Sequence, residues 1–315
     1  MGQQPQPYQI ISFYQLTPIK NPEKEVKKQQ QFIGEHDITC RVYLSEQGIN
    51  GQLSASTKDG KEYIEWMRQT PMFQHTHFKV NHYHTHVFPR KTVKYRPRLV
   101  GHDEEIDLSR RGEHVSPREW ERMLESNKDY LVLDIRNDYE WALGHFEGAT
   151  LPPCKNFREF EHYAKQLQED YQPEHPVMMC CTGGIRCELY SSILLKKGFK
   201  EVYQLEGGII NYGQTVGAKH WLGKLFVFDD RLSVSISKEE SPAIGVCRFC
   251  RQRSETYYNC ANMDCNTLFL CCGTCLSHYQ GCCTHECQDG RRIRPFHHQH
   301  LHSPFRRKHH YSETH

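Results

Sequence analysis

The chain has 315 residues, and its 40 Lys and Arg residues nearly balance 38 Asp and Glu residues. With 37% hydrophobic and 25% charged residues it can form packed cores, which excludes a wholly disordered or low-complexity protein. No apolar run approaches the ~20 residues of a membrane span, and the first residues lack the features of a secretory signal, so we expect a soluble, cytoplasmic protein with no membrane association.

The first module, residues 1–100, shows strand and helix patterns in the order β-α-β-β-α-β, which is typical of a ferredoxin-like (acylphosphatase-like) α+β domain. Gly34 is expected to end the first helix and Pro71 to close the second. The predicted strands are Gln9–Leu16, Ile38–Leu44, Gln52–Ser56 and Phe78–Phe88, and the predicted helices are Glu23–Gly34 and Thr57–Gln69.

A basic run follows this module and contains an aromatic residue, Tyr95. Closely spaced cations contact phosphates, and an aromatic ring between them can stack on a base. The alternative is a connector with a solvated face. The cations are Arg90, Lys91, Lys94, Arg96 and Arg98.

The second module, residues 115–222, alternates helices with short apolar strands, which predicts a parallel sheet with helices on both faces. Ser116, Pro117 and Glu119 have the pattern of a capped helix start. The other predicted elements are the strands Leu131–Ile135, Pro176–Cys180 and Glu201–Leu205 and the helices Phe157–Gln168 and Cys187–Lys197.

Cysteines are concentrated in the third module, residues 223–290, between Cys247 and Cys287. Inside cells, such clusters indicate metal ligation or thiol chemistry more often than disulfides. The segment 291–315 is rich in Lys, Arg and His and is expected to be a disordered tail.

The cysteine spacing predicts structural zinc, most simply two ions, because closely spaced thiolate pairs suit tetrahedral zinc and a module with a small core depends on metal to fold. His278 and His285 are competing ligands, and a redox-active thiol cluster is the alternative. An interleaved arrangement pairs Cys247 and Cys250 with Cys272 and Cys275, and Cys260 and Cys265 with Cys283 and Cys287.

The most informative stretch of the second module joins a buried strand to a helix through a glycine-containing loop. Glycines let backbone N–H groups turn inward as an anion-binding nest, and the helix N-terminus and Arg186 add positive charge. A thiolate at the start of the loop is therefore favoured over a merely structural thiol. The expected anion-binding residues are Thr182, Gly183, Gly184 and Ile185.

Two cysteines compete for the role of nucleophile. Counting from Cys181 to Arg186 gives C-x4-R, which resembles the rhodanese sulfurtransferases, whereas Cys180 gives the C-x5-R of cysteine phosphatases. Flanking motifs at 134–136, 144–149 and 203–209 favour Cys181, with Cys180 as a buried neighbour and Arg186 stabilising the anion. Cys187 is either a second redox thiol or an ordinary residue of the first helical turn.

With these residues in view, the sequence resembles the tRNA uridine hydroxylase family, whose members contain a rhodanese domain. The Cys-rich end, including TYYNCANMDCN at 256–266, is similar to the chlamydial branch of that family. The resemblance covers all three modules and rests on SEQGING at 45–51, DIRNDYEWALGHFEGA at 134–149, CTGGIRCE at 181–188, EVYQLEGGI at 201–209 and FVFDDR at 226–231.

The resemblance implies an oxidoreductase that uses molecular oxygen to convert the wobble uridine of tRNA into 5-hydroxyuridine. From their positions we expect catalytic roles for Cys181, Arg186 and Cys187 and tRNA contacts for the basic run at 90–98. No flavin or nicotinamide fingerprint is present. One hypothesis is that Cys181, as thiolate or persulfide, adds to C6 of uracil and raises the electron density at C5. The alternatives are a sulfurtransferase that carries a Cys181 persulfide to an acceptor, and a zinc-dependent RNA-binding protein with a vestigial rhodanese domain.

Overall fold

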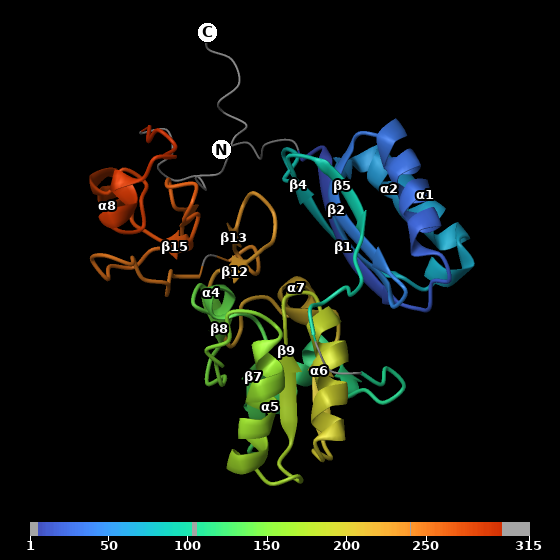
Figure 1. Cartoon of the computed structure of the whole chain (residues 1–315). Coiled ribbons are helices and arrows are strands. Elements are labelled where there is room, and N and C mark those ends of the chain that lie inside the picture. Colours follow the sequence, from blue (N-terminus) through green and yellow to red (C-terminus); the bar gives the residue numbers. More distant parts are fainter. Residues whose placement is uncertain (1–5, 103–105, 240, 298–315) are drawn as a thin grey trace. The chain divides into compact units, whose positions relative to one another are not determined.

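The computed structural model describes residues 6–102, 106–239 and 241–297 (Figure 1). The chain divides into two compact units. The first unit comprises residues 1–135 and 156–216, and the second comprises residues 136–155 and 217–315. Within the described ranges, no helix is both long enough and apolar enough to cross a membrane.

The first unit begins with the predicted α+β domain. Its helices are α1 (Pro22–Glu35) and α2 (Thr57–Gln69). Its sheet has the strand order β4-β1-β3-β2-β5, and the β-α-β-β-α-β order expected from the sequence is confirmed in its first four strands. The strands are β1 (Tyr8–Leu16), β2 (Ile38–Ser45), β3 (Gly48–Ser56), β4 (His77–Tyr83) and β5 (Lys91–Tyr95).

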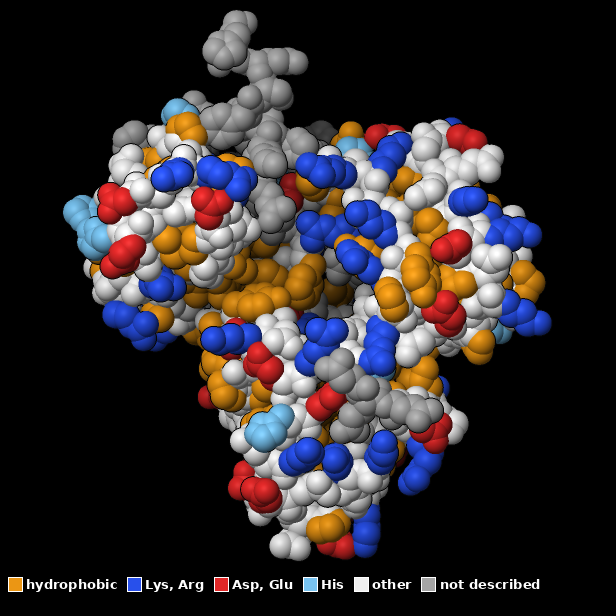
Figure 2. All heavy atoms as spheres, viewed as in Figure 1, with side chains coloured by type: hydrophobic (Ala, Val, Ile, Leu, Met, Phe, Trp, Pro, Cys, Tyr) orange, Lys and Arg blue, Asp and Glu red, His pale blue; other side chains and the backbone are white. Residues whose placement is uncertain are grey.

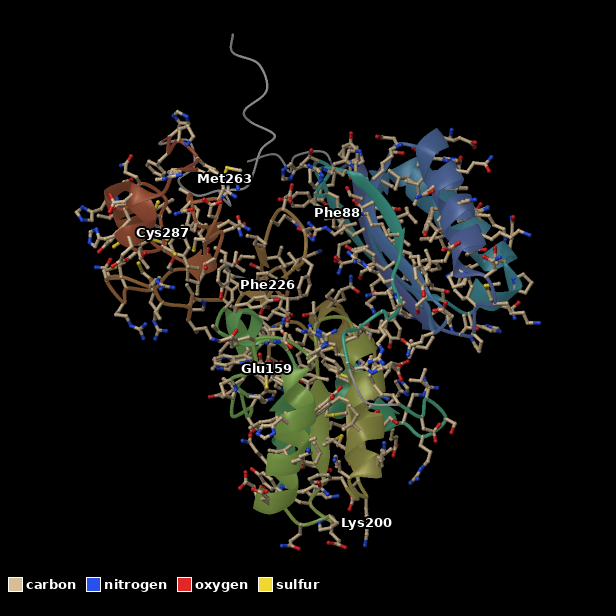
Figure 3. The ribbon with its side chains drawn as sticks, in the orientation of Figure 1. Phe88, Glu159, Lys200, Phe226, Met263 and Cys287 are labelled. Carbon is tan, nitrogen blue, oxygen red and sulfur yellow. The ribbon has the colours of Figure 1, made fainter. Side chains whose placement is uncertain are left out.

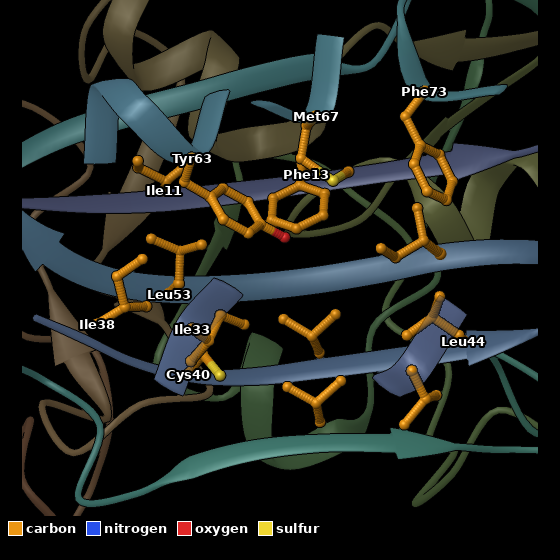
Figure 4. Close-up of a cluster of buried hydrophobic side chains, with 14 of the residues drawn as sticks. Ile11, Phe13, Ile33, Ile38, Cys40, Leu44, Leu53, Tyr63, Met67 and Phe73 are labelled. Atoms are coloured by element: carbon orange, nitrogen blue, oxygen red, sulfur yellow. The ribbon is translucent and has the colours of Figure 1, made fainter. Parts of the chain in front are cut away.

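Local sequence signals explain these elements. The Asn21 side chain accepts a hydrogen bond from the Lys24 N–H at the start of α1, and Ser56 caps α2 in the same way. The strands bury alternate residues under the two helices because successive side chains point to opposite faces. Figure 4 shows Tyr63 and Met67, from α2, beside Phe13 of β1 in this core.

One interpretation of the sequence made the basic run a connector, but the structure shows that it is not. Its central residues form β5, which pairs in parallel with β2. The preceding strand, β4, ends at Tyr83, and Val87 and Phe88 instead pack with Ile10. Because β5 lies at the sheet edge, its outward side chains remain available to solvent.

The parallel sheet predicted for the second module is confirmed. Its order is β6-β10-β9-β7, and each adjacent pair is parallel. The strands are β6 (Glu113–Val115), β7 (Leu131–Asp134), β9 (Val177–Cys180) and β10 (Val202–Leu205), and the helices are α3 (Pro117–Glu125), α5 (Glu159–Asp170), α6 (Ile185–Lys196) and α7 (Gly208–Thr215). Helix α6 begins at Ile185 rather than Cys187, and α7 was not predicted.

The second unit contains the short helices α4 (Asp138–Trp141) and α8 (Gly273–His278). The segment 136–155 is part of this unit, in which β8 (Gly144–Phe146) pairs with β11 (Trp221–Gly223). The remaining strand pairs are β12 (Leu225–Phe226) with β13 (Ser233–Val234), and β14 (Tyr257–Asn259) with β15 (Leu268–Leu270). Two 3-10 turns, Pro71–Phe73 in the first unit and Glu286–Asp289 in the second, complete the elements.

The beginning of the expected tail is ordered on the Cys-rich module. Arg294 is buried and donates to the Cys260 carbonyl and to Asn266, and Arg292 pairs with Asp264. The first residues of the predicted tail therefore contact the Cys-rich module. The rest of the predicted tail, 298–315, lies outside the described residues.

Candidate active site and cysteine clusters

The loop that follows β9 is held in place by the start of α7. Gly184, the N-cap of α6, has a φ of +104°, a conformation that favours glycine. The Ile209 and Ile210 N–H groups donate to the carbonyls of Cys181 and Thr182 at 3.0 and 3.1 Å. Gly208 permits this approach, since a Cβ there would lie 2.6 Å from the Cys181 carbonyl oxygen.

The Cys181 sulfur lies among hydrogen-bond donors. Its Sγ accepts from the Gly184 N–H at 3.1 Å, and the backbone N–H and thiol of Cys187 also donate to it. The side chain is fully buried, and burial alone would raise its pKa. The hydrogen bonds and the charge of Arg186 outweigh burial and lower the pKa of Cys181 to about 5. The buried sulfur thus faces polar groups and is a thiolate at neutral pH.

Cys187 has the opposite ionisation state. Burial and its hydrogen bond to the Cys181 sulfur raise the pKa of Cys187 well above that of an ordinary thiol. The Met179 carbonyl, 3.8 Å from the Cys187 sulfur, is another acceptor within reach, but a thiolate attracts the proton more strongly. In this arrangement Cys187 is a protonated donor to the thiolate.

Arg186 lies in the first turn of α6 and is almost fully buried. One of its terminal nitrogens is 3.4 Å from the Thr182 hydroxyl. The guanidinium therefore reaches back over the loop, and its charge lowers the pKa of Cys181.

Two side chains of the N-terminal sheet reach the same loop. Cross-strand pairing sets Ser12 opposite Lys79 and Tyr14 opposite His77, on the sheet face away from Phe13 and the helices. The Lys79 ammonium donates to the Gly183 carbonyl at 2.8 Å and lies 5.3 Å from the centre of the Tyr14 ring.

Glu188, in the first turn of α6, joins three parts of the first unit. Its carboxylate accepts from the Tyr14 hydroxyl and from His114, both at 2.9 Å, and from Arg111 at 3.1 Å. Burial opposes its ionisation, but these partners, His114 foremost, lower the pKa of Glu188. The hydrogen bond to Glu188 in turn raises the pKa of His114. Burial and the neighbouring charge of Glu188 raise the pKa of Tyr14, which stays a phenol.

A polar cleft of about 240 Å³ lies beside the loop. Cations and carboxylates both face it, so it suits a ligand with polar edges rather than an apolar one. Its lining includes Tyr14, His77, Lys79, Arg111, His114, Glu188 and Gly207.

The sequence did not reveal the N-terminal contributions to this site. Lys79 stands between apolar residues of a strand, and no local signal distinguishes a buried lysine from an exposed one. Glu188 ends the CTGGIRCE motif, and its place one residue after Cys187, in the first turn of the same helix as Arg186, is the signal in the sequence that points to it.

The basic run is only partly free to contact nucleic acid. Lys91 donates to the carbonyls of Ile33 and His36 at 2.7 and 2.8 Å, so its ammonium is engaged at the end of α1. Arg96 lies over the Tyr43 ring. Figure 2 shows Lys and Arg side chains gathered over this sheet on the face drawn.

The Cys-rich module brings together the two predicted groups of four cysteines. One group is Cys247, Cys250, Cys272 and Cys275, and the other is Cys260, Cys265, Cys283 and Cys287. Within each group all sulfur atoms lie within 4.8 Å of one another, and neither group includes His278 or His285. Figure 3 shows Cys287, a member of the second group, within this module.

The sulfur spacing fits tetrahedral metal coordination. Bonds of about 2.3 Å from zinc to four sulfurs place those sulfurs about 3.8 Å apart. The Cys250–Cys272, Cys265–Cys283 and Cys283–Cys287 sulfur distances are 3.7, 3.6 and 3.9 Å. Each of these cysteines is a free thiol, so the groups can bind metal ions.

Comparison with known proteins matches each of the three modules to a family model. Residues 8–99 match the family model described as UPF0176 acylphosphatase like domain, residues 116–215 the Rhodanese-like domain, and residues 222–288 the Rhodanase C-terminal. A crystal structure of a rhodanese-like domain protein from Staphylococcus aureus is 22% identical and covers 32% of this chain and 91% of that chain, with a TM-score of 0.28.

Two curated proteins are similar over nearly the whole length. The tRNA uridine(34) hydroxylase of Protochlamydia amoebophila is 55% identical over 312 residues, covering 99% of this chain and 97% of that protein. The protein of the same name from Chlamydia abortus is 52% identical over 305 residues, covering 96% and 93%. The chain therefore belongs to the tRNA uridine(34) hydroxylase family.

Proposed function

We propose that this protein is an oxidoreductase that hydroxylates the wobble uridine of tRNA at C5, with molecular oxygen as co-substrate. The observation that supports this function is the Cys181 thiolate, which loop amides hold beside a polar cleft. A tRNA substrate implies that the reaction takes place in the cytoplasm.

The thiolate supplies the activation that uracil needs. C6 of uracil is electrophilic because it is conjugated to the C4 carbonyl, so the Cys181 sulfur adds there and C5 becomes electron-rich. C5 then reacts with oxygen; one oxygen atom stays on C5 and the other leaves as water, which requires an external two-electron donor. Because Cys181 is fully buried, the side chains over the loop must move aside to admit the base.

Arg186 and the loop amides keep the sulfur ionised, and Cys187 supports them as a hydrogen-bond donor. Their shared role is to stabilise the negative charge of the buried sulfur. Without hydrogen-bond donors and a nearby positive charge, a buried thiolate would take up a proton. Thr182, Gly183, Gly184 and Ile185 set the loop geometry.

Zinc is proposed for both cysteine groups, with a structural role. Four thiolates at tetrahedral spacing suit zinc, which would stabilise a module that has few regular elements. Neither group includes a cysteine of the Cys181 loop.

Contacts with tRNA are assigned to the basic residues at the edge of the N-terminal sheet. Arg90, Lys94, Arg96 and Arg98 remain candidates for phosphate contacts, which make binding sensitive to salt. Lys91 is removed from this role because its ammonium caps α1.

Nucleoside mass spectrometry of tRNA tests the function. Cells lacking the gene should lose 5-hydroxyuridine at the wobble position, and the intact gene should restore it, whereas Cys181→Ser should not. Cys180→Ala is the matched control, because Cys180 ends the strand and should be dispensable for the reaction.

A parallel assay of thiocyanate formation from thiosulfate and cyanide addresses the sulfurtransferase alternative. Unchanged wobble uridine together with rapid thiocyanate formation would reverse the assignment. If Cys181→Ser kept full activity and Cys180→Ala lost it, the nucleophile would be Cys180 rather than Cys181.

A further inference from the structure

Lys79 is a buried charge that contacts the loop that holds Cys181. Its side chain comes from β4 and is 4% exposed. Burying an ammonium is costly unless it is paired, yet its hydrogen bond to the Gly183 carbonyl takes only one of its three N–H groups. Lys79 also lines the cleft and is attracted by the charge of Cys181. The lysine therefore joins the loop that holds Cys181 to the cleft, and its charge acts on the reactive sulfur.

We propose that Lys79 is a catalytic residue whose ammonium binds the C4 oxygen of uracil while the Cys181 sulfur adds to C6. This inference rests on the proposed function and adds to it a residue from the N-terminal domain, which a rhodanese domain by itself lacks. Tyr14 positions the Lys79 ammonium: its ring lies under the ammonium, and its hydroxyl is held by a hydrogen bond to Glu188.

The step balances without an oxidant. The sulfur lone pair forms the S–C6 bond, the C5–C6 π bond breaks, and its electron pair moves through C4 to leave the charge on O4. The Lys79 ammonium stabilises this enolate by a charged hydrogen bond or by transferring a proton. The step reverses when the sulfur leaves, so it takes place without oxygen and can be measured separately from hydroxylation.

The surroundings of Lys79 set the pH range in which it can act. Burial lowers the pKa of Lys79 to about 8, and the negative charge of Cys181 partly offsets this. The step should therefore strengthen as Cys181 ionises near pH 5 and weaken as Lys79 loses its proton near pH 8. The titratable and charged groups around it are Tyr14, His75, His77, Arg111, His114, Cys181, Glu188 and Glu206.

Hydrogen exchange at C5 under argon tests the proposal. The full-length protein is mixed with tRNA transcripts that carry tritium at C5 of uridine, and a transcript with cytidine at the wobble position gives the background. In the adduct, C5 of the enolate takes up a proton from water, and loss of the tritium from C5 as the sulfur leaves restores the uracil ring. The wild-type protein should therefore release tritium into water. Lys79→Met should slow the release by about 10²-fold, the range of a lost general acid.

Two further variants separate chemistry from structure. Lys79→Arg keeps the charge but does not titrate below pH 12, so exchange should persist and no longer fall near pH 8. Lys58→Met removes an exposed lysine of α2 and should leave exchange unchanged.

Each outcome decides the question. The role of Lys79 would be overturned if Lys79→Met released tritium as fast as the wild type. It would also be overturned if the exchange rate of Lys79→Arg still fell near pH 8. Hydroxylation by the wild-type protein without any exchange under argon would also overturn it, while leaving the proposed function intact. If Lys79→Met does not fold, the pH profile of Lys79→Arg still decides. Absence of wobble hydroxylation in the wild type would instead count against the proposed function.

Discussion

At the scale of single residues, the site depends on which of two neighbouring cysteines is ionised and which keeps its proton. Cys181 and Cys187 are both fully buried cysteines, yet one is ionised and the other is protonated. The difference follows from the loop amides and Arg186, which favour charge on Cys181, and Cys187 then donates its proton toward that charge. This arrangement explains a second cysteine near the first without assigning it redox chemistry.

Substitutions of Cys187 distinguish a donor from a redox thiol. Cys187→Ala removes the donor and should raise the midpoint for Cys181 ionisation, because a hydrogen bond to a charged group contributes about 1.5–3 kcal/mol. Cys187→Ser keeps a donor and should have a midpoint near that of the wild type. The measurement is thiolate ultraviolet absorbance against pH, with Cys181→Ser as the blank. Equal loss of hydroxylation in Cys187→Ser and Cys187→Ala, at pH values where Cys181 is ionised, would favour a redox role instead.

The same ionisation gives a pH dependence with a defined sign. The pKa of Cys181 is lower in the folded protein than that of an ordinary thiol, so its charge stabilises the fold at alkaline pH. This contribution decreases below the pKa of the unfolded thiol and is lost as the pH falls through about 5. We expect the activity, measured at pH values where the protein stays folded, to fall as the pH drops through about 5. The unfolding free energy of Cys181→Ser should lack the pH-dependent contribution of the thiolate. A wild-type stability profile that matches that of Cys181→Ser down to pH 4 would contradict the assignment.

At the scale of secondary-structure elements, the edge strand β5 places two of its lysines in different surroundings. Lys91 turns toward the C-terminal end of α1, whose last turn carries no basic residue of its own. Lys94, on the same strand, is exposed and stays a candidate for tRNA contact. One basic run therefore contains a lysine bound to the end of α1 and a lysine that we propose for tRNA contact.

Substitutions of these two lysines should have opposite effects. Lys91→Met should reduce the unfolding free energy by about 0.3–1 kcal/mol, the usual contribution of a cation at a helix C-terminus, with little change in tRNA affinity. Lys94→Met should leave stability nearly unchanged and should weaken tRNA binding, with a smaller salt dependence. Chemical denaturation and tRNA titrations at several salt concentrations measure both. A larger loss of tRNA affinity in Lys91→Met than in Lys94→Met would contradict this division.

At the scale of the whole molecule, the two units are stabilised differently. The first unit has a conventional apolar core in its N-terminal domain, with residues such as Ile11, Leu53 and Tyr63 fully buried. In the second unit, the core around Tyr258 and Phe269 is made largely of cysteines. Metal should therefore matter far more to the second unit than to the first.

Zinc content and chelation test this difference. Freshly purified reduced protein should contain two zinc ions per chain, and Cys272→Ser should lower the content, whereas Cys271→Ala should not, since Cys271 belongs to neither group. A strong chelator should remove the unfolding transition of the second unit in calorimetry and leave that of the first. Less than one zinc per chain, or chelation without effect on unfolding, would count against structural zinc.

The sequence by itself determined the order of elements, the parallel sheet, the loop that holds Cys181 and the two groups of four cysteines. These features are local: Ser116 and Ser56 cap the helices that follow them, strands alternate with a period of two, and cysteine pairs lie close along the chain. The full-length similarity to tRNA uridine(34) hydroxylases confirms the family that the motifs predicted.

Only the tertiary structure decided which distant residues complete the site. Lys79 meets Gly183 across 104 positions of sequence, and Tyr14 meets Glu188 across 174. Such contacts depend on which face of a strand turns toward the neighbouring domain, and a one-residue change in strand register would reverse that face. The burial of Lys79, the engagement of Lys91 at α1 and the proton on Cys187 follow from packing, which no local pattern encodes.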